Sequence, residues 1–148
     1  MSTDKLHLEG TIIQDYKDWL EEVKTLSSYV AKWATRIKHN EETSDPKLHR
    51  CLEFIVAEAN HLRDVIPSMK EVIRPQSSLK DLLDILDVVR TSANVIHCCV
   101  TIFVSNSVGE PDSGVISDTG LMAKYDEILS ALAQEAKPHF RALGEKYD

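Results

Sequence analysis

The chain has few residues that interrupt or cross-link regular structure. Its 148 residues include five glycines, five prolines and three cysteines. This composition excludes a fibrous repeat and a disordered low-complexity tail. Cys51 and the adjacent pair Cys98 and Cys99 match neither a disulfide framework nor a zinc-ligand spacing. We therefore expect reduced thiols in a cytoplasmic protein that holds no metal and no cofactor.

Blocks of positive charge are also absent. The chain has 24 acidic and 17 basic residues, which gives a net charge of -7, and the two signs alternate along its length. Proteins that bind nucleic acid or anionic membranes draw affinity from clustered lysine and arginine. We therefore expect neither nucleic acid nor an anionic lipid surface as a partner.

Targeting and membrane signals are missing as well. The first ten residues, MSTDKLHLEG, do not combine a basic region, an apolar core and a small-residue cleavage site. The longest nearly uninterrupted apolar run, Val95 to Val104, is about half the length that a bilayer requires. The sequence thus predicts a soluble protein without stable membrane insertion.

Four long stretches repeat apolar residues at alternating intervals of three and four, which is the pattern of a helix with one buried seam. We predict helices over residues 11–38, 46–73, 79–104 and 121–147, preceded by an arm at 1–10 that Gly10 separates from the first helix. The first seam includes Trp19 and Trp33, for which core filling is the favoured role. The fourth seam reads Tyr125, Leu129, Leu132, Ala136, Phe140, Leu143 and Tyr147.

The second helix has a recognisable start and an internal proline. Asp45 followed by Pro46 is typical of an N-cap with proline at the first helical position. Its seam, which runs from Leu48 to Ile73, keeps the same register across Pro67. We therefore expect a kink at Pro67, and another at Pro138 in the fourth helix, rather than helix ends.

Four helices of similar length, joined by short or flexible connections, predict an all-α fold, an antiparallel up-down-up-down four-helix bundle. Residues 11–148 form one domain in this prediction. The stretch 105–120 holds Gly109, Gly114 and Gly120 and fits neither a calcium loop nor a phosphate-binding loop. We interpret it as a flexible connector.

The third helix has more apolar surface than a bundle buries. Besides its seam it carries a second set of apolar residues: Ile85, Val88, Val95, Cys99 and Ile102. A bundle helix needs an apolar stripe only about 100° wide. Three alternatives are open: the amino-terminal arm or the loop residues Val115 and Ile116 cover this set, a partner helix or second copy covers it, or it stays uncovered. We take it as the candidate partner-binding surface.

Candidate catalytic and metal-binding residues are sparse. Arg90 and His97 have six residues between them, the spacing of the Arg and His pair in the HEPN ribonucleases, and helical geometry brings both to one face. Glu58 and His61 form one Glu-x-x-His motif of the di-iron type, but the seam phase turns His61 outward. The same phase predicts that Cys98 is accessible to solvent and that Cys99 is not.

The third and fourth helices resemble a known hairpin. The run IHCCVTIFVSNSV, a loop, and then MAKYDEILSALAQ are similar to the last helical hairpin of vinculin-like bundles, in the class of focal-adhesion-targeting and α-catenin domains. The resemblance implies a scaffold that receives amphipathic helices in grooves between its own helices. We therefore expect a non-enzymatic protein-interaction module. The alternatives are a ribonuclease of HEPN type using Arg90 and His97, and a membrane-permeabilising helical bundle.

Overall fold

The computed structural model describes residues 10–39, 45–76, 79–106 and 117–147, and the side chains of 13–39, 45–76, 80–106 and 117–134. Four helices account for nearly all of these residues. They are α1 (Gly10–His39), α2 (Pro46–Val72), α3 (Leu79–Asn106) and α4 (Asp118–Tyr147). The four predicted helices are confirmed, with ends that differ by a few residues at most.

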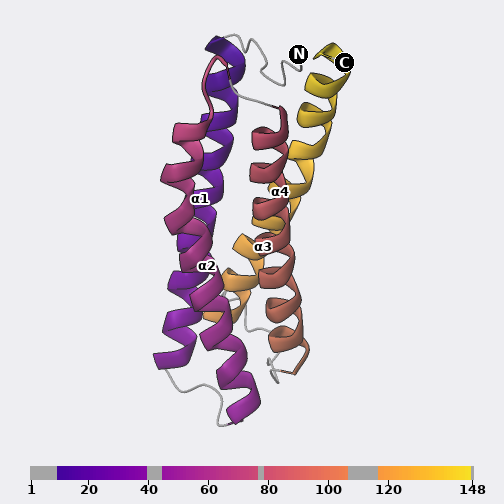
Figure 1. The fold of residues 1–148 in the computed structure, drawn as a ribbon. Coiled ribbons are helices and arrows are strands. Elements are labelled where there is room, and N and C mark those ends of the chain that lie inside the picture. The colour runs from indigo at the N-terminus through magenta and orange to yellow at the C-terminus, as the bar shows by residue number, and fades with distance from the viewer. Residues whose placement is uncertain (1–9, 40–44, 77–78, 107–116, 148) are drawn as a thin grey trace.

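The helices form a ring in which each packs against two others. α1 contacts α2 and α4, and α3 also contacts α2 and α4. Successive helices run in opposite directions, so α1 begins and α4 ends at the same end of the molecule (Figure 1). The described residues therefore form the antiparallel up-down-up-down bundle that the sequence predicts.

Local hydrogen bonds explain where two helices begin. Asp45 caps α2 as predicted, since its carboxylate accepts a hydrogen bond of 2.9 Å from the backbone N–H of Lys47. α4 begins at Asp118, earlier than the predicted residue 121, because the hydroxyl of Ser117 accepts a bond of 3.0 Å from the N–H of Gly120. Gly10, expected to separate the arm from the helix, is the first residue of α1.

Both internal prolines lie within helices, as predicted. α2 continues through Pro67 to Val72, and the range of α4 includes Pro138. α2 and α4 both run toward the end of the bundle where α1 begins (Figure 1), and each proline lies in the second half of its helix, so both fall toward that end. The kinks themselves stay a prediction.

The buried core follows the predicted seams closely in α2 and less closely in α1. Every seam residue of α2 from Leu48 to Ile73 is buried. In α1, Leu20 and Ala34 are fully buried, whereas Trp19 and Trp33 are half-buried at the edge of the core. The ring of Trp19 stays at the edge because its indole N–H donates a bond of 3.0 Å to the carbonyl oxygen of Leu132 on α4.

The described part of α4 also buries a different set from the predicted one. Met122, Asp126 and Ala133 are buried together with the predicted Leu129. Tyr125 and Leu132 are partly buried against the core. The remaining predicted seam positions, at 136, 140, 143 and 147, lie outside the described side chains.

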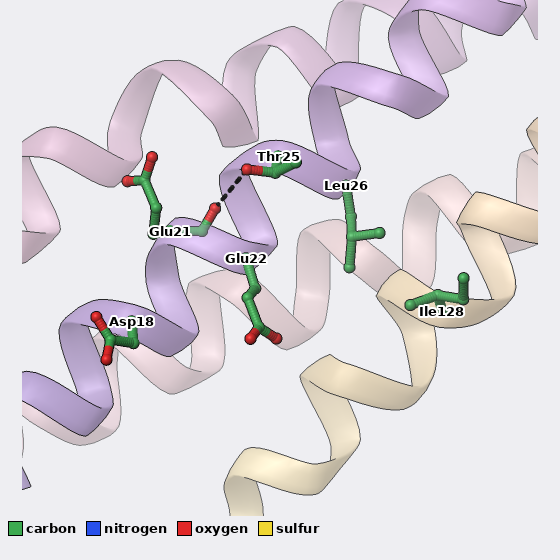
Figure 2. Close-up of a pocket in the computed structure, with 6 residues that line it drawn as sticks. All are labelled: Asp18, Glu21, Glu22, Thr25, Leu26 and Ile128. Carbon is green, nitrogen blue, oxygen red and sulfur yellow. Dashed lines mark hydrogen bonds between the residues drawn. The ribbon is translucent and has the colours of Figure 1, made fainter.

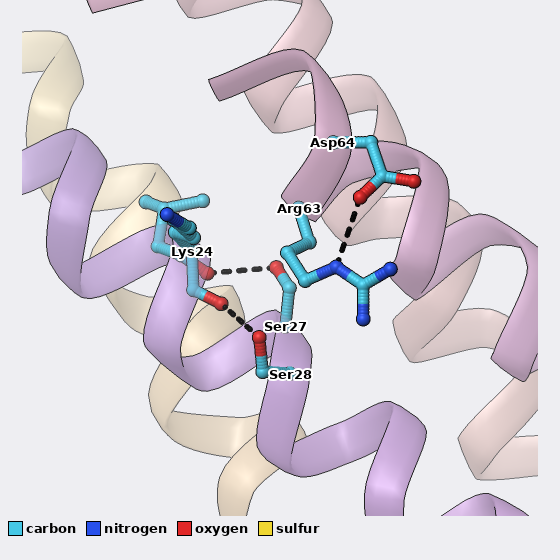
Figure 3. A network of polar contacts seen from close by, with 6 residues as sticks. Lys24, Ser27, Ser28, Arg63 and Asp64 are labelled. Carbon is cyan, nitrogen blue, oxygen red and sulfur yellow. Dashed lines mark hydrogen bonds and ion pairs between the residues drawn. The ribbon is translucent and has the colours of Figure 1, made fainter. Parts of the chain in front are cut away.

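Two ion pairs and a buried serine mark the contact of α1 with α2. Glu21 pairs with Lys70 near one end, and Lys38 lies 3.6 Å from Glu53 near the other. Between them Ser27 is fully buried, and its hydroxyl donates a bond of 2.7 Å to the carbonyl oxygen of Val23 in its own helix. Figure 3 shows this hydroxyl turned back along α1. A small side chain with its polar group satisfied allows the two helices to pack here at little cost.

Candidate functional site

A polar contact fixes the register of α2 against α3. The buried hydroxyl of Ser92 donates a hydrogen bond of 3.0 Å to a carboxylate oxygen of Glu58. Because the helices are antiparallel, residues seven positions further along α3 lie opposite residues seven positions earlier in α2. This places Cys99 opposite Cys51, and both thiols are half-buried against the core.

The predicted partner-binding residues of α3 divide into three groups by exposure. Ile85 is only 6% exposed and belongs to the core, which corrects its assignment to an outer surface. Val95 and Cys99 are half-buried. Val88 and Ile102 are 41% and 51% exposed. Ile85 is buried because it faces α2 at the same level as Val65, one heptad from the Ser92 contact.

The sequence analysis missed one residue of this surface, Phe54 on α2. Its side chain is 51% exposed. It lies three positions after Cys51, on the outer side of the groove between α2 and α3, at the level of Val95. Its exposure could have been predicted from the sequence, because Phe54 is a large aromatic residue outside the apolar seam of its helix. We call the surface formed by Phe54, Val88, Val95, Cys99 and Ile102 the α2–α3 face.

The α3 side of this face carries almost no charge. Between Val88 and Asn106 the only residue charged at neutral pH is Arg90, with histidine counted as neutral, and it faces α4. By length and composition alone, residues Lys80–Asn106 are long and apolar enough to cross a membrane, although 33% of their most apolar window is buried inside the bundle. The sequence analysis considered only the apolar run from Val95 to Val104 and so missed the length and apolar composition of the whole helix. The absence of stable membrane insertion stays a prediction.

The two cysteines differ in the predicted direction, although Cys99 keeps partial exposure. Cys98 is exposed, and Cys99 is half-buried. Burial, and next the neighbouring Cys51, raise the pKa of the Cys99 thiol, with smaller effects from Cys98 and Glu58. A raised pKa leaves less thiolate and so lowers reactivity.

Arg90 and His97 both face α4, on the opposite side of α3 from the α2–α3 face. The Nδ1 atom of His97 lies 2.7 Å from a carboxylate oxygen of Asp126. Arg90 donates a bond of 3.1 Å through its Nη2 to the side-chain oxygen of Gln134, whose amide nitrogen lies 3.4 Å from the side-chain oxygen of Asn94. The two predicted catalytic residues are therefore each engaged by a side chain of α4.

Asp126, the α4 residue that contacts His97, is unusual for a carboxylate because it is only 1% exposed. Its second carboxylate oxygen is buried without a hydrogen-bond partner in the described part of the chain. Burial raises the pKa of the Asp126 carboxyl, and the hydrogen bond and charge of His97 offset part of that rise. A buried acid that positions a half-exposed imidazole is an arrangement that can assist proton transfer.

Metal binding has little support in the described residues, which contain no group of three or more histidine, cysteine, aspartate or glutamate side chains arranged to hold an ion. The Glu58 and His61 motif does not converge, since Glu58 bonds to Ser92 and His61 is exposed.

Comparison with known proteins identifies no relative of this chain. No family model, no curated protein and no solved structure matches the chain. The resemblance of the α3 and α4 hairpin to vinculin-like bundles therefore stays a prediction, and the function has to be argued from the surface of the bundle itself.

Proposed function

We propose that this chain is a non-enzymatic interaction module that binds a partner helix, or a second copy of itself, on the α2–α3 face. The observation that supports this most is the joint exposure of Phe54 on α2 with Val88 and Ile102 on α3. Large apolar side chains gathered beside one groove favour association, because covering them removes apolar surface from water. Grooves between helices commonly receive amphipathic helices.

Light scattering of the purified chain over a range of concentrations tests self-association. If the second copy is the partner, the wild-type mass is that of a dimer and Ile102→Glu lowers it to that of a monomer. Leu83→Glu is the matched control, since Leu83 is 39% exposed and lies on the same helix one heptad before Arg90, which faces α4. It should leave the mass unchanged.

If the wild type is a monomer, the proposed partner on the α2–α3 face is a helix from another protein. In that case an apolar dye such as anilinonaphthalene sulfonate should bind the wild type, and binding should fall with Ile102→Glu or Phe54→Ser but not with Leu83→Glu. A wild type that is monomeric and binds no dye would contradict the proposal, because the face would then be covered within the chain.

A ribonuclease is the second candidate, and the short contact of His97 with the buried Asp126 favours it. In this candidate function the imidazole would accept the proton of a 2'-hydroxyl, and Arg90 would hold the phosphate. The test is RNA cleavage by the purified chain. Cleavage that Arg90→Ala abolishes would replace the interaction proposal with the enzymatic one.

A further inference from the structure

A second surface lies across the bundle from the α2–α3 face, between α1 and α4. It is a hollow of about 530 Å³ lined by five residues of α1 and one of α4: Asp18, Glu21, Glu22, Thr25, Leu26 and Ile128. Figure 2 shows Glu22 and Leu26 pointing from α1 toward the side where Ile128 projects from α4. Glu21 points away from Ile128 in the same view. We call this surface the α1–α4 hollow.

The apolar part of the hollow continues along the groove. Ile128 is 43% exposed and Leu26 is half-buried. One turn further, the rings of Tyr29 and Tyr125 meet with their centroids 4.8 Å apart, and Tyr29 is 40% exposed. An apolar stripe on a partner would therefore find a continuous apolar strip rather than one isolated side chain.

The carboxylates of the hollow are not equivalent. Glu21 is neutralised by Lys70 of α2, and the hydrogen bond and charge of Lys70 lower the pKa of the Glu21 carboxyl. Among the described residues, Asp18 accepts a neutral hydrogen bond of 2.8 Å from Gln14. In the described part of the chain, neither Asp18 nor Glu22 has an ion-pair partner within 4.0 Å. Four positions apart on one helix, they form an acidic rim that no ion pair among the described residues neutralises.

Positive charge lies beyond the tyrosine pair. The ammonium of Lys124 is 5.9 Å from the ring of Tyr125, and Lys32 and Arg36 lie 5.1 Å and 5.0 Å from the ring of Trp33. Because Arg36 also pairs with Asp118 at 3.6 Å, the groove runs from an acidic end to an end where Lys32 and Lys124 carry the positive charge. A charged partner would be held in one direction along it.

We propose that the α1–α4 hollow binds an amphipathic helix whose apolar side chains cover Leu26 and Ile128 and whose lysines or arginines pair with Asp18 and Glu22. The net charge of -7 favours the approach of a cationic segment and disfavours nucleic acid. This surface is separate from the α2–α3 face, so the proposal stands or falls independently of the proposed function.

The test uses a synthetic helix made only of leucine and lysine, with leucines at i, i+3, i+4 and i+7, titrated into the full chain by calorimetry. We expect binding that weakens about three- to tenfold in Glu22→Gln and in Ile128→Ser, because each removes one rim charge or apolar contact. The matched control is Asp87→Asn, which neutralises an exposed carboxylate of α3 and so changes the net charge by the same amount as Glu22→Gln. It should change the affinity by less than about twofold.

Equal losses in Glu22→Gln and Asp87→Asn would overturn the proposal, since they would show attraction to net charge alone. The same holds if a leucine and glutamate helix of the same pattern binds as well as the lysine one. The losses caused by Glu22→Gln and Ile128→Ser should be the same in the Ile102→Glu background, which keeps this result distinguishable from binding to the α2–α3 face. Circular dichroism of each variant checks that these surface substitutions keep the helices.

Discussion

The α2–α3 face and the α1–α4 hollow occupy opposite grooves of one ring of helices, yet they offer different chemistry. On the first, half-exposed Phe54 and Ile102 lie beside a helix with almost no charge. On the second, Ile128 lies between the carboxylates of Asp18 and Glu22, which have no ion pair among the described residues, and the cations Lys32 and Lys124. Folding needs only the buried seams, so the positions flanking each seam are free to differ, and they decide what each groove can bind.

The largest expected effect is a difference in stability between two kinds of substitution in α3, one in its buried seam and one in its outer stripe of Val88, Val95 and Ile102. Ile96 is fully buried, whereas Ile102 on the same helix is 51% exposed. Ile96→Ala should lower the free energy of unfolding by about 2–5 kcal/mol, and Ile102→Ala by less than about 1 kcal/mol. Urea denaturation measures both. Equal losses would mean that the outer stripe contributes to folding and is not available for a partner.

The next effect concerns the contact of His97 on α3 with Asp126 on α4, which belongs to neither surface. His97→Ala should cost about 1–3 kcal/mol of unfolding free energy, because it leaves the buried carboxylate of Asp126 without its hydrogen bond. Asp126→Asn should cost less at pH 7, since it also removes the buried charge. In the His97→Ala background, Asp126→Asn should recover part of the loss.

The pH dependence of stability gives the sign of the Asp126 contribution. Its folded-state pKa is raised above the unfolded value of about 3.9, so the carboxyl stabilises the fold most below that pH and loses this contribution as the pH rises through the folded-state pKa. Asp126→Asn should therefore gain stability relative to the wild type as the pH rises from about 3.5 to 7. A constant difference between the two proteins over this range would contradict the raised pKa.

A smaller effect is expected on the affinity of the α1–α4 hollow for the leucine and lysine helix when negative charge is added to that hollow. Lys70→Gln releases Glu21 from its ion pair and so adds its negative charge to those of Asp18 and Glu22 near the hollow. The leucine and lysine helix should then bind about two- to threefold more tightly and with a stronger dependence on salt. Calorimetry at two ionic strengths measures both quantities. An affinity that does not change would show that Glu21 does not take part in binding.

The smallest expected effect leaves stability unchanged and reports on the two cysteines. A thiol reagent should modify Cys98 first and Cys99 more slowly, because Cys99 is half-buried and its thiol pKa is raised. Mass spectrometry of the briefly labelled native chain gives the order. Modification of Cys99 before Cys98 would show that the outer side of α3 is turned differently from the one described.

Much of the fold could be predicted because helix formation and seam position depend on residues close together in the chain. The alternation of three and four from Leu48 to Ile73 predicts the buried side of α2 completely. The Asp45 and Pro46 pair predicts its start. The prediction for α1 was less complete because two tryptophans occupy its seam, and the indole of Trp19 bonds to a carbonyl of α4 that no local pattern indicates.

The candidate surfaces could be predicted only in part. Val88, Val95 and Ile102 follow from the heptad spacing of α3, but the periodicity did not show that Ile85 is covered by α2 or that Phe54 lies beside Val95. The α1–α4 hollow was not predicted at all, since its residues come from helices about a hundred positions apart. The burial of Asp126 opposite His97 was missed because the two residues lie on different helices, 29 positions apart, and no local pattern shows which residues of the two helices meet.

The sequence by itself determined that this chain forms four amphipathic helices with one excessively apolar member, because periodicity and capping act within a few turns. Only the tertiary structure decided which flanking residues share a groove. That choice depends on the rotation of each helix about its axis and on its register against its neighbours, which the packing of all four seams sets together.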